Sequence, residues 1–225
     1  MPRLRSKQLS LPTPSTWGGR RQGAGRKPGH RPGPPHALRP EHDPRHPVHI
    51  TFRAGPKVPS LRSDLLWPAL RAALEAASRS SFRVIHFSIQ ADHLHIIVEA
   101  DSSRELCGGL RGLAIRTALA INRCCGRRGP VWTSRYHARA LHTPREVRVA
   151  LTYVLLNFCK HLRAAPGVDP RSSARWFDGW KRPPPKPADP CPTRRAQTWL
   201  GAQGWRRAGG PVDFRENPFR QPIRT

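Results

Sequence analysis

Apolar and polar positions follow regular patterns mainly between residues 46 and 162 of the chain. Short runs in this segment alternate apolar with polar side chains, which is typical of half-buried strands. Longer stretches repeat Leu and Ala at intervals of three and four residues, which indicates amphipathic helices. The elements predicted in this way are a strand over 46–53, a helix over 61–78, strands over 82–90 and 93–100, a helix that ends near 126, a strand over 131–141 and a last helix.

Local signals set several boundaries of these elements. Residues 102–105 and 143–146 each form a capping-box pattern, and the second has Pro144 at the favoured first helical position. Residues 91–92 leave a short turn between two strands, which predicts a hairpin. The order strand, helix, strand, strand, helix, strand, helix predicts an α+β fold with a ferredoxin-like antiparallel sheet, helices on one face and an added C-terminal helix.

Proline divides the chain into three parts. Residues 1–45, 46–162 and 163–225 contain 9, 6 and 11 of the 26 prolines. We therefore expect a flexible basic Gly/Pro-rich arm over 1–45, one folded domain over 46–162 and a basic extension over 163–225. Four tryptophans in the extension either pack against the core or stack on bases, and the sequence leaves both interpretations open.

The net charge of +26, from 40 Lys and Arg against 14 Asp and Glu, indicates a polyanionic partner. Nucleic acid is the partner we expect, and basic residues in the arm and the core are candidate phosphate contacts. They are Arg20, Arg21, Arg26, Lys27, Arg53, Arg135, Arg139 and Lys160.

Other compositional features narrow the cellular setting. No apolar run is long enough to span a membrane, and the N-terminus lacks the apolar segment of a secretory signal. The five cysteines are odd in number and form no Cys-x-x-Cys pair, so neither a disulfide framework nor a zinc ribbon is expected. A reducing cytoplasm, with the protein at the nucleoid, is the expected location.

Two histidines occupy alternate positions of one predicted strand, in the run His93-Leu94-His95. Side chains two residues apart on a strand point to the same face, so both imidazoles lie opposite Leu94. Two neutral imidazoles at this spacing can bind one divalent cation. A chain with 11 histidines also produces such a pair by chance, so the pair alone leaves the question open.

The last predicted helix places a tyrosine and an amide one turn apart. At about 100° per residue, Tyr153 and Asn157 lie together on the flank of the buried stripe. A boundary tyrosine beside an amide is common, but together with the histidine pair it supplies a third metal ligand and a hydroxyl. A cation held there would polarise a phosphoryl group for attack by Tyr153, which gives a 5′-phosphotyrosine and a 3′-hydroxyl. The stripe consists of Val147, Ala150, Leu151, Val154, Leu155 and Phe158.

These motifs resemble the single-tyrosine HUH transposases, and most closely the REP-associated tyrosine transposases. The resemblance rests on Asp-His-Leu-His at 92–95, Tyr-Val-Leu-Leu-Asn at 153–157 and the segment 129–136, and it spans roughly 46–162. The Gly- and Arg-rich run at 18–28 is similar to the basic arms of some members. Phe158 departs from the family pattern, in which many members have Pro after the Asn.

The resemblance implies a metal-dependent enzyme that cleaves and joins single-stranded DNA, often near hairpins. It implies His93, His95 and Asn157 as ligands of Mg²⁺ or Mn²⁺, Tyr153 as the catalytic nucleophile on the added helix, and a monomer or a homodimer. A relative that binds structured DNA without cutting it has the same fold and charge. An RNA-binding sheet would instead carry surface aromatics on its central strands, where this chain has His and aliphatic residues.

Four further residues of the core have alternative interpretations. Tyr136 is the only other tyrosine, and we interpret it as a packing or base-stacking residue. His49 and His86 are candidates for the same sheet face as the histidine pair, although a strand histidine is more often a satisfied polar residue. Glu99 shares the face of His93 by alternation, and we expect it to be exposed.

Overall fold

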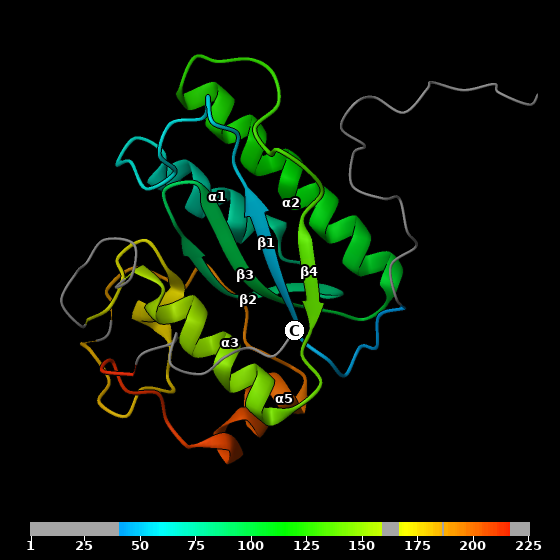
Figure 1. Cartoon of the computed structure of the whole chain (residues 1–225), viewed down its shortest axis with the longest axis vertical. Coiled ribbons are helices and arrows are strands. Elements are labelled where there is room, and N and C mark those ends of the chain that lie inside the picture. Colours follow the sequence, from blue (N-terminus) through cyan, green and yellow to red (C-terminus); the bar gives the residue numbers. More distant parts are fainter. Residues whose placement is uncertain (1–40, 159–166, 186, 217–225) are drawn as a thin grey trace, which may run out of the picture. The chain divides into compact units, whose positions relative to one another are not determined.

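The computed structural model describes residues 41–158, 167–185 and 187–216. The candidate residues Arg20, Arg21, Arg26, Lys27 and Lys160 lie outside these ranges. Within them the elements are arranged as in Figure 1: β1 (Val48–Arg53), α1 (Trp67–Ala77), β2 (Phe82–Ile89), β3 (His93–Ala100), α2 (Ser103–Cys124), β4 (His137–Ala140), α3 (Pro144–Leu156), η1 (Ser173–Trp176), α5 (Trp199–Ala202) and η2 (Gly204–Ala208).

The four strands form one sheet in the order β2-β3-β1-β4, and all neighbours are antiparallel. The predicted α+β fold with an antiparallel sheet is therefore confirmed, and the element and strand orders are those of a split βαβ arrangement. The register pairs Thr51 with His95 and Arg53 with His93. No helix among the described residues is long and apolar enough to cross a membrane.

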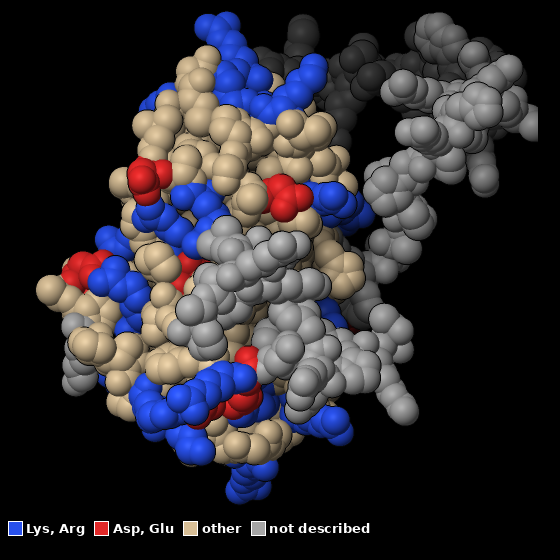
Figure 2. All heavy atoms as spheres, turned by 60° about the vertical axis from the view of Figure 1, so that its left-hand side comes forward, with Lys and Arg blue, Asp and Glu red and all other residues tan. Residues whose placement is uncertain are grey.

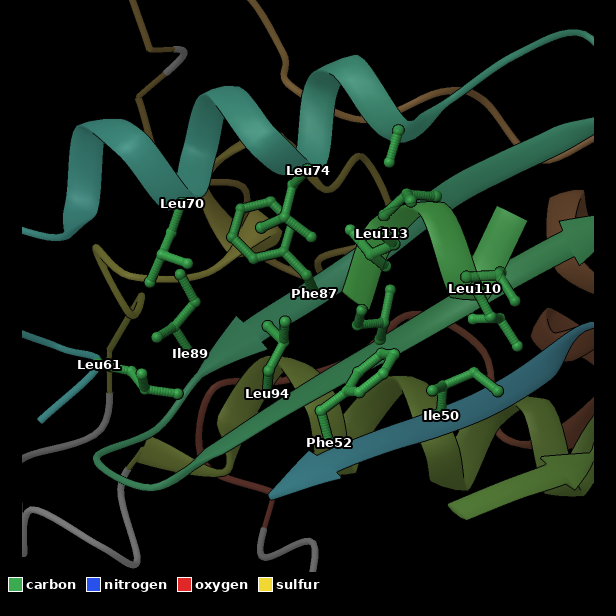
Figure 3. Close-up of a cluster of buried hydrophobic side chains, with 14 of the residues drawn as sticks. Ile50, Phe52, Leu61, Leu70, Leu74, Phe87, Ile89, Leu94, Leu110 and Leu113 are labelled. Carbon is green, nitrogen blue, oxygen red and sulfur yellow. The ribbon is translucent and has the colours of Figure 1, made fainter. Parts of the chain in front are cut away.

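Helices α1 and α2 cover one face of the sheet and enclose the larger hydrophobic core (Figure 3). Strand residues Ile50, Phe52 and Leu94 pack there against Leu74 and Leu113 of the helices, and all five are at most 2% exposed. Alternation along the strands sends the residues between them to the other face. That other face is the one that carries the candidate site.

Helix α3 lies on the opposite face, and its predicted buried stripe is confirmed: each stripe residue is at most 6% exposed. It packs there with Ile85 and Ile97 of the sheet and with residues of the C-terminal extension. The N-terminus of α3 has the predicted capping box, with Thr143 and Glu146 bonding each other's backbone N–H groups and Pro144 in the first turn.

The C-terminal extension packs against α3 and β2, which answers the question that its tryptophans left open. Trp180 and Trp205 are 5% and 2% exposed and lie in the second hydrophobic cluster with α3, whereas Trp199 remains 48% exposed. Buried polar contacts fasten the extension as well. Asp169, for example, accepts two hydrogen bonds from the Arg62 guanidinium, at 2.9 and 2.7 Å.

Glu99 was expected to be exposed, and that expectation is wrong, because the extension covers it. Its carboxylate is fully buried and accepts hydrogen bonds from the backbone N–H groups of Gln197 and Thr198 and from the Thr198 hydroxyl. Arg83 supplies the counter-charge at 3.4 Å. Only a contact between residues about a hundred positions apart in the chain explains this burial.

Two predicted elements are shorter than expected. Helix α1 begins at Trp67 rather than 61, because residues before it form turns in which Arg62 reaches the Ile89 carbonyl. Strand β4 covers only 137–140. Bends at residues 133–135 interrupt the strand, although Trp132 before them still forms an isolated bridge with Ala54 next to β1 and donates its indole N–H to the Ala114 carbonyl of α2.

Candidate active site

The predicted histidine pair stands on the sheet face opposite α1 and α2. The two rings are nearly parallel, with centroids 5.9 Å apart and an interplanar angle of 6°. His93 Nδ1 lies 2.6 Å from Asp92 Oδ1, and His95 Nδ1 lies 3.1 Å from Thr51 Oγ1. Such partners on one ring nitrogen fix the orientation of a metal-ligating imidazole and direct its other nitrogen outward.

Helix α3 brings Tyr153 to this pair. The Tyr153 ring meets the His95 ring edge to face, with centroids 5.1 Å apart and an interplanar angle of 86°. The side chain is half-buried, as its position on the flank of the stripe predicts. Burial raises the pKa of Tyr153 above its usual value of 10, and the nearby Asn157 amide acts in the opposite direction. The phenol is therefore neutral near pH 7.

Asn157 follows Tyr153 by one turn and caps the end of α3. It is fully buried, which is more than its flank position predicted. Its amide oxygen and nitrogen form no well-aligned hydrogen bond with any described residue. Its nearest established polar partner is Tyr153, whose pKa burial raises and the Asn157 amide lowers.

His49 joins the cluster from β1, and the alternation of β1 had already made it a candidate for this face. Its ring stacks on that of His95 at 5.6 Å and meets that of Tyr153 at 5.8 Å. Burial, together with the charges of His137 and Arg139, lowers the pKa of His49 to about 4, so the imidazole is neutral at pH 7. Its Nε2 is buried without a hydrogen-bond partner among the described residues.

The second tyrosine lies elsewhere. Tyr136 packs against the ring of Phe52 at 5.6 Å and belongs to the periphery of the core under α1 and α2. Phe52 points away from the face of His93 and His95, since it alternates with Thr51 along β1. Only Tyr153 shares that face with the histidine pair.

Two imidazoles and an amide oxygen are donor types that bind divalent cations. No group of three His, Cys, Asp or Glu side chains capable of holding a metal occurs in the described parts of the chain. The Asn157 amide, which forms no well-aligned hydrogen bond with a described residue, offers an oxygen one turn from Tyr153. His86 is not part of this set, because it bonds Ser173 and packs on Phe177 of the extension.

The candidate phosphate contacts of the core differ in availability. Arg139 donates to Glu146 at 2.9 Å, so its charge is already compensated. Arg53 lies next to His93 across the register, with Asp92 at 4.0 Å and most of its side chain exposed. Arg135 is exposed and forms no salt bridge within the described ranges. Lys and Arg are also widespread on the face shown in Figure 2, where acidic side chains are few.

Comparisons with known proteins give one informative result. No family model matches the chain, and no curated protein matches it. Solved structures do match, among them that of a REP-associated tyrosine transposase bound to a REP hairpin. The two chains are 17% identical, and the superposition has a TM-score of 0.46 and covers 56% of this chain and 73% of the other.

Proposed function

We propose that this chain is a metal-dependent single-stranded DNA endonuclease and strand transferase, a transposase of the single-tyrosine HUH type. Hairpin-containing DNA is the proposed substrate, and the cytoplasm, at the nucleoid, is the proposed site of action. The observation that supports this proposal most is the contact between Tyr153 and His95, whose ring stands parallel to that of His93. A potential nucleophile and two potential metal ligands thus share one face of the sheet.

His93, His95 and Asn157 would hold the Mg²⁺ or Mn²⁺ ion. Such an ion polarises the scissile phosphoryl group and stabilises the charge that develops on it. The phenolic oxygen of Tyr153 attacks the phosphorus, and the bond from phosphorus to the 3′ oxygen breaks. The phenol gives up its proton as the new bond forms, and the departing oxygen takes up one proton in exchange, so it leaves as a 3′-hydroxyl with no net change in protons.

The product of this step is a 5′-phosphotyrosine. Its phosphodiester bond conserves the energy of the bond that was broken, so a second 3′-hydroxyl can displace the tyrosine without ATP. This second step joins the strand to a new end and returns the hydroxyl to Tyr153. Cleavage and joining therefore require the same residues.

The basic surface accounts for affinity in this proposal. Arg53 supplies a phosphate contact next to His93, the exposed Arg135 is a further contact, and the basic residues of the arm, Arg20, Arg21, Arg26 and Lys27, add others. Phosphate contacts release counterions and make binding depend steeply on salt concentration. The net charge of +26 is in keeping with a polyanionic substrate.

A labelled hairpin oligonucleotide with single-stranded flanks tests the proposal. It is incubated with the full chain and Mn²⁺, and the products are separated on a denaturing gel. We expect a covalent protein–DNA band that is absent with Tyr153→Phe and retained with Tyr136→Phe. If neither Mg²⁺ nor Mn²⁺ yields a band while the chain still binds the hairpin, the protein is a DNA-binding relative that does not cut.

A further inference from the structure

A groove of about 530 Å³ lies between the end of α1 and the first turns of α2. This is the layer of the molecule that covers the sheet face turned away from Tyr153. The groove is therefore separate from the candidate active site. Its lining consists of Arg79, Arg104, Glu105, Cys107, Gly108 and Arg111.

The arginines of this groove are not paired with acidic side chains in the described part of the chain. Arg79, Arg104 and Arg111 are exposed, and none of them forms a salt bridge with a described residue. Arg83, by contrast, pairs with Asp101 at 2.8 Å. The one carboxylate in the lining, Glu105, accepts a hydrogen bond from the Ser81 hydroxyl at 2.7 Å, and it does not neutralise three cations.

Two guanidinium groups come together beside the groove. A Cβ atom built on Gly112 would lie 2.9 Å from Arg116 Nη1 and 3.7 Å from Arg79 Nη2, so both cations approach one point on the surface of α2. Like charges that share an exposed surface repel each other weakly in water, and an anion between them relieves that repulsion. Arg116 also has no salt bridge within the described ranges, so the arrangement favours a bound anion.

The spacing of the arginines favours an extended anion. Arg104 and Arg111 are seven residues apart on α2, which is about 10 Å along the helix axis. Each strand of a DNA duplex places about three phosphates over that length of the helix axis. Guanidinium groups match phosphate oxygens in geometry and charge. Gly108 keeps the space between the two arginines open, because no atom lies within 4 Å of its built Cβ position.

We propose that this groove binds the phosphodiester backbone of the DNA substrate, as a second contact on the layer opposite the candidate active site. The inference rests on the proposed function only in taking DNA as the polyanion. The groove contributes affinity and takes no part in the chemistry. The strand bound in the groove belongs to a part of the DNA other than the segment that lies near Tyr153.

The test compares two variants that lose the same charge. One is Arg79→Gln/Arg104→Gln/Arg111→Gln. Its control is Arg194→Gln/Arg195→Gln/Arg215→Gln, which changes three exposed arginines of the extension that also lack salt bridges among the described residues. Binding of a fluorescein-labelled hairpin oligonucleotide to the full chain is measured by anisotropy at several salt concentrations, without divalent ions.

We expect the groove variant to bind at least tenfold more weakly than the control variant. The slope of log affinity against log salt should fall by about two for the groove variant, since each lost phosphate contact accounts for roughly 0.7–0.9. Equal losses of affinity in the two variants overturn the proposal. Failure of the wild-type chain to bind the hairpin overturns it as well.

A second pair of variants fills the groove without removing an arginine. Gly108→Glu places a carboxylate between the cations, and Gly108→Gln places an uncharged side chain of the same size there. If the groove binds DNA, the Gly108→Glu variant should bind the hairpin clearly more weakly than the Gly108→Gln variant. The two variants should have the same thermal stability. Equal affinities of these two variants for the hairpin would contradict the proposed groove. The Tyr153 adduct at saturating DNA is a separate readout, so its absence rejects the proposed chemistry and leaves the groove intact.

Discussion

The rings of Tyr153 and His95 meet edge to face at 5.1 Å, although one belongs to α3 and the other to β3. Both residues come from the same chain, because α3 packs on the sheet of its own molecule. Each molecule therefore carries the whole candidate constellation. This geometry gives several outcomes that measurement can check.

Replacing Asn157 by Leu separates function from stability. The buried amide forms no well-aligned hydrogen bond with a described residue, so the apolar side chain should leave the free energy of unfolding nearly unchanged. The same substitution removes the proposed oxygen ligand and should abolish the Mn²⁺-dependent DNA adduct. Urea denaturation and the gel assay give the two readouts. A large destabilisation would instead assign Asn157 to the fold.

The buried arginine of α3 should matter for stability. Arg148 bonds both carboxylate oxygens of Glu216, at 2.7 and 2.8 Å, and two further carbonyls of the extension. Glu216→Ala leaves that charge without its partner and should lower the free energy of unfolding by about 2 kcal/mol. The exposed pair of Arg182 and Asp213 is the control, since Arg182→Ala should cost under about 1 kcal/mol.

Two adjacent glycines of α2 should respond to alanine in opposite directions. A Cβ atom on Gly109 would lie 2.2 Å from Phe82 Cγ, so Gly109→Ala forces the core apart and should destabilise the protein by about 2 kcal/mol. Gly108 faces open space, and Gly108→Ala should stabilise α2 by about 0.5–1 kcal/mol. Thermal unfolding of the two variants measures both signs, and a shared sign would contradict this packing.

Acid should lower the free energy of unfolding by protonating His86, which lies between β2 and the extension. Burial lowers the pKa of His86 to about 4, whereas the unfolded chain binds that proton near pH 6.5. The free energy of unfolding should therefore be constant above pH 6.5 and fall between pH 6.5 and 4, by at most about 3 kcal/mol from this residue. Urea denaturation at pH 7.5, 5.5 and 4.5 measures the decline.

The matched variant for that decline is His86→Phe, which keeps the ring against Phe177 and removes the titrating group. It should show a smaller loss of stability over the same pH interval. A decline identical to that of the wild type would assign the acid sensitivity to other groups.

Local periodicity was enough to place most of the candidate site. The period of two on β3 put His93 and His95 on one face, and the period of 3.6 on α3 put Tyr153 on the flank of its stripe. These rules depend only on neighbours in the sequence. They work here because each element is long enough to express its pattern.

What the sequence did not reveal depends on distant contacts. The burial of Glu99 arises from Thr198 of the extension, and bends at residues 133–135 shorten β4. The stacking of His49 on His95 follows from strand order, which alternation along one strand does not specify. Side chains that meet only after the chain has folded leave no periodic signal.

Mass spectrometry of the protein–DNA adduct tests the central claim most directly. The full chain is incubated with a hairpin oligonucleotide and Mn²⁺, digested with nuclease and protease, and searched for a nucleotide attached to tyrosine. The account predicts a 5′-phosphonucleotide on the peptide that contains Tyr153. A nucleotide on Tyr136, or a modified peptide that also forms with His93→Ala/His95→Ala, would contradict it.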